Sequence, residues 1–194
     1  MAGSRIFRSR PPAEVVREFL ATEGGKPFSY PEVGATRGDG PAGYALDRCQ
    51  ECLGKGQRTF EAACAALRRW EMFRLGWVDV YWPDAPLAEG SVVAVLGRFS
   101  GLCFLNACRI VYLIDGGSPL RRFDFAYGTL PAHCERGEER FQIEWRNDDS
   151  VWYGIYCFSR PSAPIYRLGS PILRRLQRRF RADSLAAMER AVGS

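Results

Sequence analysis

The sequence predicts an α+β fold in which an antiparallel sheet of about six to seven strands packs against a long C-terminal helix. Two observations carry this prediction. Apolar and polar residues alternate along segments between residues 77 and 160, as in half-buried strands. The chain then closes with Leu173, Leu176 and Phe180 on one face of a helix. A composition of 46% hydrophobic and 25% charged residues is that of an ordinary globular protein, which excludes disordered, collagen-like and disulfide-dense classes.

The N-terminal part of the chain predicts a short strand, a helix and a long loop. Residues 5–9 have strand-like alternation, and residues 13–21 form an amphipathic helical pattern after a proline pair. Residues 22–57 are rich in glycine and proline, so we expect a loop there, with short strands at most. Loops of this size in a compact domain are usually functional or packed on themselves.

The rest of the chain predicts a second helix, six strands and the closing helix. Apolar residues between 58 and 74 recur at steps of three and four, which indicates a helix. The predicted strands are 77–82, 91–99, 106–114, 121–130, 138–146 and 150–160. Short polar turns join them, which favours antiparallel hairpins over parallel crossovers. The closing helix spans residues 171–192, and we expect one domain over residues 1–194.

This order of elements resembles the helix-grip fold, in which a strongly curved antiparallel sheet wraps around a long C-terminal helix. START-like lipid-binding proteins, polyketide cyclases and plant allergens are built in this way. With an aromatic content of 13%, the resemblance implies an apolar pocket enclosed by the sheet and the closing helix.

Longer motifs carry a more specific resemblance. They are YPEVGATR (30–37) with PAGY (41–44), LGKGQRTFEAACAALRRWEMFRLGW (53–77), and FAYGTLPAHCERGEERF (125–141) followed by FSRP (158–161). Together they are similar to uncharacterised protein family 0548, a domain of unknown function found as a single-domain protein in bacteria and plants. Ala132-His133-Cys134 stands where that family usually has Gly-His-Pro. The resemblance covers about residues 5–190 and implies no reaction.

His133 and Glu139 are the candidate catalytic groups. His133 is the only histidine and lies in a turn between two predicted strands. Imidazole titrates near neutral pH and is a common general acid or base. The alternative is a structural histidine that bonds a backbone carbonyl. Glu138 and Glu139 point to opposite faces of their strand, and alternation alone does not decide which of them faces the interior.

Arg109 is the best single candidate for binding an anionic group. An arginine in the middle of an apolar strand needs a carboxylate or a ligand for its five donors. A salt bridge to Glu138 or Glu139 is the alternative, and Arg160 has a similar pair of interpretations. The remaining candidate ligand contacts are polar or aromatic residues of the predicted loops and strands: Tyr30, Tyr44, Trp77, Tyr127, Thr129 and Glu138.

Cysteine usage and the N-terminal sequence predict a cytoplasmic protein. The seven cysteines are scattered, and no apolar signal segment begins the chain, so we expect reduced thiols. No run of about 18 apolar residues predicts a transmembrane helix. CQEC at 49–52 has the spacing of half a zinc site, but no second pair accompanies it, so no metal is expected. No nucleotide fingerprint is present either, and no cofactor is expected.

The net charge of +5 is concentrated in the closing helix. Residues 171–181 contain five arginines and no acidic residue, while the other 22 basic residues balance 22 acidic ones. No motif for nucleic acid accompanies these arginines, so nucleic acid is not an expected partner. A basic amphipathic helix can make weak contact with an anionic membrane surface, although a solvated helix face is the commoner explanation.

These features predict a protein that binds a small hydrophobic or amphipathic molecule between the sheet and the closing helix. Arg109, Tyr127, His133 and Glu139 are the expected polar contacts. The first alternative is a cofactor-independent cyclase, isomerase or lyase that uses His133 or Glu139 as general base. The second is an interaction module that binds an anionic partner through the basic helix in a salt-sensitive way.

Overall fold

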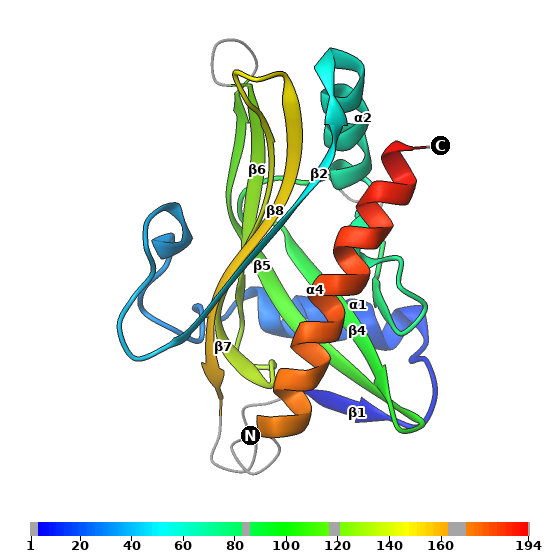
Figure 1. Cartoon of the computed structure of the whole chain (residues 1–194). Helices are drawn as coiled ribbons and strands as arrows, with labels where there is room; N and C mark the ends of the chain where they lie inside the picture. Colours follow the sequence, from blue (N-terminus) through cyan, green and yellow to red (C-terminus); the bar gives the residue numbers. More distant parts are fainter. Residues whose placement is uncertain (1–3, 83–85, 117–120, 163–169, 194) are drawn as a thin grey trace.

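The computed structural model describes residues 4–82, 86–116, 121–162 and 170–193 (Figure 1). In chain order the elements are β1 (Arg5–Phe7), α1 (Ala13–Gly24), β2 (Ala45–Lys55), α2 (Gly56–Arg68), β3 (Val78–Val80), β4 (Val92–Phe99), β5 (Leu102–Gly116), β6 (Arg122–Thr129), β7 (Glu135–Trp145), β8 (Ser150–Pro161) and α4 (Ser170–Val192), with 3₁₀ turns at Ala35–Arg37 and Glu71–Phe73. The closing helix and all six predicted strands appear at the expected places, with shifts of a few residues at their ends.

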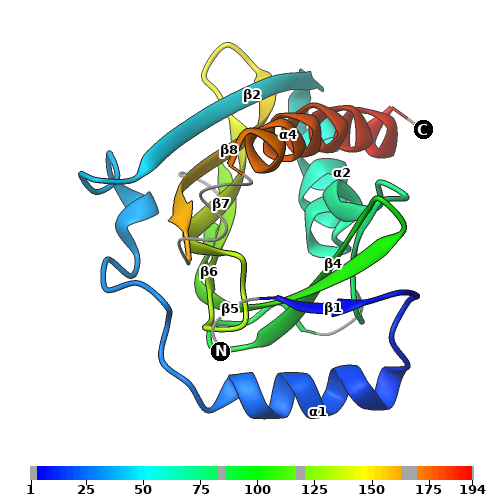
Figure 2. The ribbon, with the colours of Figure 1, turned by 90° about the horizontal axis from the view of Figure 1, so that it is seen from below.

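The strands form one antiparallel sheet in the order β2-β8-β7-β6-β5-β4-β3, and β1 pairs with β5. The long strand β5 changes partner along its length, because residues 102–109 pair with β4 and residues 108–116 with β6. A register shift between Ile110 and Tyr112 marks a bulge, which bends a strand and increases its twist. Figure 2 shows the resulting sheet curled around α4 and α2. The predicted α+β helix-grip fold is confirmed.

The two faces of the sheet are covered by different parts of the chain. The inner face packs against α2, the turn Glu71–Phe73 and α4, and this core contains aromatic residues such as Phe125, Phe141 and Tyr153. The outer face carries α1, whose Val16 and Phe19 are fully buried in a second cluster. Figures 1 and 2 show residues 28–44 on the outer side of β7 and β8, away from α4.

Residues 45–55 differ from the sequence prediction. The composition of residues 22–57 predicts a long loop, but β2 is an eleven-residue strand that pairs with β8 along its length. It is the edge strand of the sheet, and most of its side chains are exposed or half-buried. A strand without a buried face needs no alternation of apolar residues, which is why the pattern missed it.

The second predicted helix also ends earlier than expected. The periodicity predicts residues 58–74, but α2 ends at Arg68 and Trp70 adopts a left-handed conformation with φ of 58°. This residue turns the chain into the 3₁₀ turn that carries Phe73. Trp70 is 2% exposed and packs edge-on against Phe125, so tertiary packing holds the turn that local periodicity does not reveal.

Candidate functional site

A cavity of about 180 Å³, here called the inner cavity, lies between the inner face of the sheet and α4. Its wall combines apolar and polar side chains. The apolar ones are chiefly Phe73, Trp77, Val95, Leu176 and Phe180, and the polar ones are chiefly Tyr127, His133, Glu135, Glu139, Gln177 and Arg181. Part of the space exists because β4 has a glycine there: a Cβ added to Gly97 would meet no heavy atom within 4 Å. The volume is below the roughly 300–1,000 Å³ of sites for drug-sized ligands, so it suits a smaller molecule.

Tyr127 and Glu139 form the central polar pair of the inner cavity. They are opposite each other on β6 and β7, and the Tyr127 hydroxyl donates to Glu139 Oε2 at 2.5 Å. Burial raises the pKa of Glu139 to about 7, and the hydrogen bond from Tyr127 opposes this only in part. Burial also raises the pKa of Tyr127 well above its usual value, so the phenol keeps its proton. Glu139 can therefore gain or lose a proton near neutral pH.

His133 lines the same cavity, but its pKa is shifted so that the ring does not titrate near neutral pH. Its Nδ1 lies 3.0 Å from the backbone nitrogen and 3.2 Å from the carbonyl oxygen of Glu135, so it bonds the backbone of the turn in either neutral tautomer. Burial lowers the pKa of His133 to about 4, so the ring is neutral at pH 7. One ring nitrogen of His133 is occupied by the turn.

Glu135 connects the sheet to the closing helix beside this histidine. Its carboxylate accepts hydrogen bonds from Gln177 of α4 at 2.8 Å and from Ser159 of β8 at 3.2 Å. Burial raises the pKa of Glu135. These contacts fix one end of α4 over the inner cavity.

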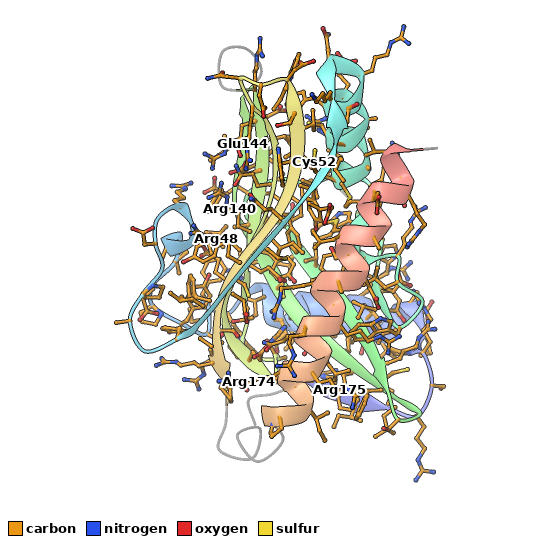
Figure 3. The ribbon with its side chains drawn as sticks, viewed as in Figure 1. Arg48, Cys52, Arg140, Glu144, Arg174 and Arg175 are labelled. Carbon is orange, nitrogen blue, oxygen red and sulfur yellow. The ribbon has the colours of Figure 1, made fainter. Side chains whose placement is uncertain are left out.

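The arginines of the closing helix do not form one uniform basic surface. Arg181 lines the inner cavity and pairs with Asp47 of β2 at 3.0 Å, and Arg179 pairs with Asp183 at 3.3 Å. Four of the five arginines are exposed, but within the described residues only three of these are without an ion pair: Arg174, Arg175 and Arg178, the first two of which are labelled in Figure 3.

Glu138 borders the inner cavity and is 2% exposed, but its carboxylate bonds residues of the outer face. Its carboxylate accepts the Tyr30 hydroxyl and the Gly34 N–H, each at 2.7 Å, and the Thr36 N–H at 3.0 Å. The Thr36 hydroxyl donates to it as well. Tyr30 reaches this carboxylate only because Gly128 lies beneath its ring: an added Cβ there would be 2.1 Å from the Tyr30 hydroxyl. Glu138 and Tyr30 therefore anchor the segment 28–44 to the outer face.

Arg109 also lies on the outer face. It is therefore away from the inner cavity, and among the described residues it forms no salt bridge with Glu138 or Glu139. Its Nη2 donates to the backbone carbonyls of Gly24 and Lys26 at 2.7 and 2.8 Å, and its guanidinium lies over the ring of Phe28. A cation at this position satisfies carbonyls at the C-terminal end of α1. The cavity anion site expected at Arg109 is thus replaced by a helix cap.

The other candidates divide between the two faces of the sheet. Trp77 and Thr129 line the inner cavity together with Tyr127, His133 and Glu139. Tyr44 and Arg160 stack on each other with 4.5 Å between guanidinium and ring centroid, and the Tyr44 hydroxyl donates to Glu32 at 2.6 Å. With Glu138, whose carboxylate bonds residues on the outer face, six of the ten candidates therefore lie along the cavity.

Five polar cavity residues were not predicted: Asn106, Glu135, Ser159, Gln177 and Arg181. A signal exists for two of them. Glu135 has the same parity as Glu139 on β7, and Gln177 lies between Leu173 and Phe180 on the apolar face of α4, where a polar residue is out of place. The other three, on β5, β8 and α4, are recognised only after these elements are placed around the cavity.

The described residues offer neither a metal site nor a membrane-spanning helix. No group of three or more His, Cys, Asp or Glu side chains among them is arranged to hold a metal ion. Cys49 and Cys52 lie on the edge strand β2, with Cys52 exposed. Within the same part of the chain, no helix combines the length and apolar character needed to cross a membrane.

The curled sheet, its closing helix and the cavity between them define a START-like, helix-grip protein. A START superfamily protein from Mycobacterium smegmatis superposes with a TM-score of 0.52 at 14% identity, covering 78% of this chain and 98% of that one. A protein of Thermus thermophilus gives a TM-score of 0.52 at 12% identity over 76% of this chain and 97% of its own. These likenesses concern the fold.

Sequence comparison identifies the family. Residues 29–187 match the family described as "Domain of unknown function (DUF1990)". A UPF0548 protein of Dictyostelium discoideum is 40% identical over 78% of this chain and 74% of its own length. Another, from Deinococcus radiodurans, is 34% identical over 97% of this chain and 100% of its own. The chain belongs to the UPF0548 (DUF1990) family, as its motifs predict.

Proposed function

We propose that this protein binds a small amphipathic molecule in the inner cavity. The observation that carries the proposal is a predominantly aromatic and aliphatic wall with one titratable pair, Tyr127 and Glu139, in contact with it. Binding sites for small molecules are mostly apolar, with a few polar groups that orient the ligand. The fold resemblance to a START superfamily protein supports a ligand cavity at this place.

The polar end of the ligand is inferred from the groups that it would meet. Within the described residues Glu139 accepts one side-chain hydrogen bond, from Tyr127, so its carboxylate keeps acceptor capacity on the cavity side. Arg181, the cation of this wall, is already paired with Asp47. A hydroxyl or amine head group therefore fits better than a carboxylate, and a short alkyl chain or ring fits beside Phe73 and Phe180.

Three compounds with the same tail test this proposal: hexylamine, 1-hexanol and hexanoate. Isothermal titration at pH 8, where Glu139 is mostly ionised, should give the tightest binding for the amine and the weakest for hexanoate. Native mass spectrometry of the purified protein should also reveal any small molecule that co-purifies from the cell.

Two glycine variants make this experiment specific. Gly97→Leu places a side chain in the inner cavity and should abolish binding of all three compounds. Gly154→Leu is the matched control, because Gly154 lies on β8 facing the other side of the sheet, where a Cβ meets only ordinary contacts at 3.7 and 3.9 Å. Binding that survives Gly97→Leu, or the absence of binding by all three compounds at millimolar concentration, would reject the proposal.

A second candidate function is cofactor-independent proton abstraction with Glu139 as base. The observation that favours it is the carboxyl with a pKa of about 7 beside a phenol donor in a buried cavity. A base of this kind removes a proton next to a carbonyl, as cyclases, isomerases and lyases require. His133 is less suited, because its Nδ1 already bonds the backbone of Glu135.

Exchange of the α-protons of cyclohexanone in D₂O, followed by NMR, tests this second function. The protein should accelerate exchange with a rate that rises through about pH 7, since the ionised Glu139 is the base. Glu139→Gln should remove the acceleration, whereas His133→Gln should retain it. If Glu139→Gln exchanges as fast as the natural protein, Glu139 is not a base.

A further inference from the structure

The outer face of the sheet contains a second cavity of about 280 Å³, here called the outer cavity. It lies between β2, β7 and β8 and residues 37–39 of the segment that Glu138 anchors. Its wall is polar and rich in arginine: Arg37, Arg48 and Arg140 face it, together with Gln50, Gln142 and Tyr156. This composition differs from the apolar wall of the inner cavity and indicates a different kind of ligand.

The strand register explains why these side chains meet. Arg48, Tyr156 and Arg140 are direct neighbours across β2, β8 and β7, so they form one row on the outer face. The next row has Gln50 on β2 and Gln142 on β7, but Gly154 between them on β8. The missing side chain at Gly154 leaves the floor of the cavity open. Figure 3 shows Arg48 and Arg140 close together on the side of the sheet away from α4.

Two buried polar atoms at this cavity have no hydrogen-bond partner in the described structure: Arg140 Nε and Tyr156 Oη. Tyr156 is 7% exposed, and the side chain of Arg140 is 11% exposed. Unsatisfied buried polar atoms are rare because each carries a desolvation cost, so they often mark an absent ligand or water. Here both unpaired atoms are donors.

The guanidinium groups of Arg37 and Arg48 at the rim stack on aromatic rings, and their N–H groups can still donate hydrogen bonds. Arg37 lies over the ring of Tyr112 at 4.3 Å, and Arg48 lies over the ring of Tyr156 at 4.4 Å. Stacking uses the flat face of a guanidinium and leaves its N–H groups in the plane. Among the described residues, no carboxylate lies within 4.0 Å of either guanidinium.

Acidic groups offset this positive charge only in part. Asp124 pairs with Nη2 of Arg140 at 2.9 Å and also with Arg122, so it is shared between two cations. Asp39 is the acidic residue that lines the cavity, opposite three arginines. The surplus of charge and of donors therefore favours an anion with several acceptor oxygens.

We propose that the outer cavity binds the oxyanion group of a small molecule, a phosphate or a carboxylate. Arg140 Nε and the Tyr156 hydroxyl would donate from the base of the site, and Arg37 and Arg48 would close on the anion from the rim. The glutamine amides supply further neutral donors. This site lies on the opposite face of the sheet from the inner cavity and does not depend on the function proposed there.

Isothermal titration at constant ionic strength, with chloride as the balancing anion, tests this site. Inorganic phosphate is the probe in one arm and succinate in the other, so the arm that binds identifies the oxyanion. Arg48→Gln should weaken binding by about tenfold or more, because a charge-assisted hydrogen bond is lost. Gly154→Leu should abolish binding by filling the floor.

Two controls separate this site from general charge and from the inner cavity. Arg175→Gln removes the same charge from the exposed face of α4 and should leave the affinity unchanged. Gly97→Leu, which blocks the inner cavity, should also leave it unchanged. The proposal fails if neither anion binds at millimolar concentration, if Arg175→Gln weakens binding as much as Arg48→Gln, or if Gly154→Leu binds normally.

Discussion

Glu138 and Glu139 are neighbours in one strand, yet they face two different regions of the molecule. On the outer face, Glu138 accepts hydrogen bonds from Tyr30, Gly34 and Thr36 and fastens a distant segment to the sheet. On the inner face, Glu139 accepts a single hydrogen bond from the part of the chain that the structure describes, that of Tyr127, and it lines a cavity. The number of donors decides what a buried carboxylate does. A saturated one is structural, and an undersaturated one is left for a ligand or a proton.

The largest expected effect comes from removing the saturated carboxylate. Glu138→Ala leaves the Tyr30 hydroxyl and two backbone N–H groups without their acceptor, and unsatisfied buried donors are costly. We expect a loss of about 3 kcal/mol or more in the free energy of unfolding, measured by urea denaturation. Glu139→Ala, its neighbour, should cost clearly less. Equal losses for the two variants would show that the two faces do not differ in this way.

The pH dependence of stability sharpens the comparison on the inner face. The pKa of Glu139 rises from its ordinary value of 4.5 to about 7 in the folded protein, so the folded state binds an extra proton between these values. Its stabilising effect is therefore complete below pH 4.5 and is lost as the pH rises through about 7, by up to about 3 kcal/mol. Glu139→Gln should lack this decrease.

The measurement is the difference in unfolding free energy between Glu139→Gln and the natural protein from pH 4 to 9. Taking the difference removes the contribution of His133, which has the opposite sign: its pKa is lowered to about 4, so its stabilising effect is lost as the pH falls. A difference that does not change with pH would contradict a raised pKa for Glu139.

A smaller effect is expected from the tyrosines that serve the two carboxylates. Tyr30→Phe removes a buried donor from Glu138 and should cost about 1–2 kcal/mol. Tyr127→Phe removes the donor from Glu139 and should cost less at pH 5, where that carboxyl is protonated. It should also raise the pKa of Glu139 further, because the lost hydrogen bond favours the ionised form. NMR titration of the Glu139 carboxyl carbon checks this shift.

Much of the fold was predictable because its signals are local. Strands β4 to β8 and helix α4 each bury one apolar face. This produces the alternation of the strands and the apolar stripe of the helix, and both patterns are visible in the sequence. β2 was missed because none of its residues is fully buried, so its sequence needs no alternation of apolar and polar residues. The early end of α2 was missed because Trp70 turns there to pack against Phe125, which lies far along the chain.

The site was predictable only in part for a related reason. The sequence placed Tyr127, His133 and Glu139 as candidates, and they meet at the inner cavity. It also showed that Arg109 in an apolar strand needs partners, but the partners are carbonyls at the end of α1, more than 80 residues away in the chain. The local sequence shows that a buried arginine needs hydrogen-bond partners. Which groups become those partners depends on how distant segments pack against it.

By itself, the sequence determined the fold class, the family and the fact that Glu138 and Glu139 face opposite sides. The tertiary structure alone decided which side is the interior, because α2 and α4 cover the face that carries Phe125 and Phe141. It also created the outer cavity, since residues from β2, β7 and β8 meet only when three strands are paired in register. Periodicity along one chain segment specifies a face, and contact between distant segments specifies what that face binds.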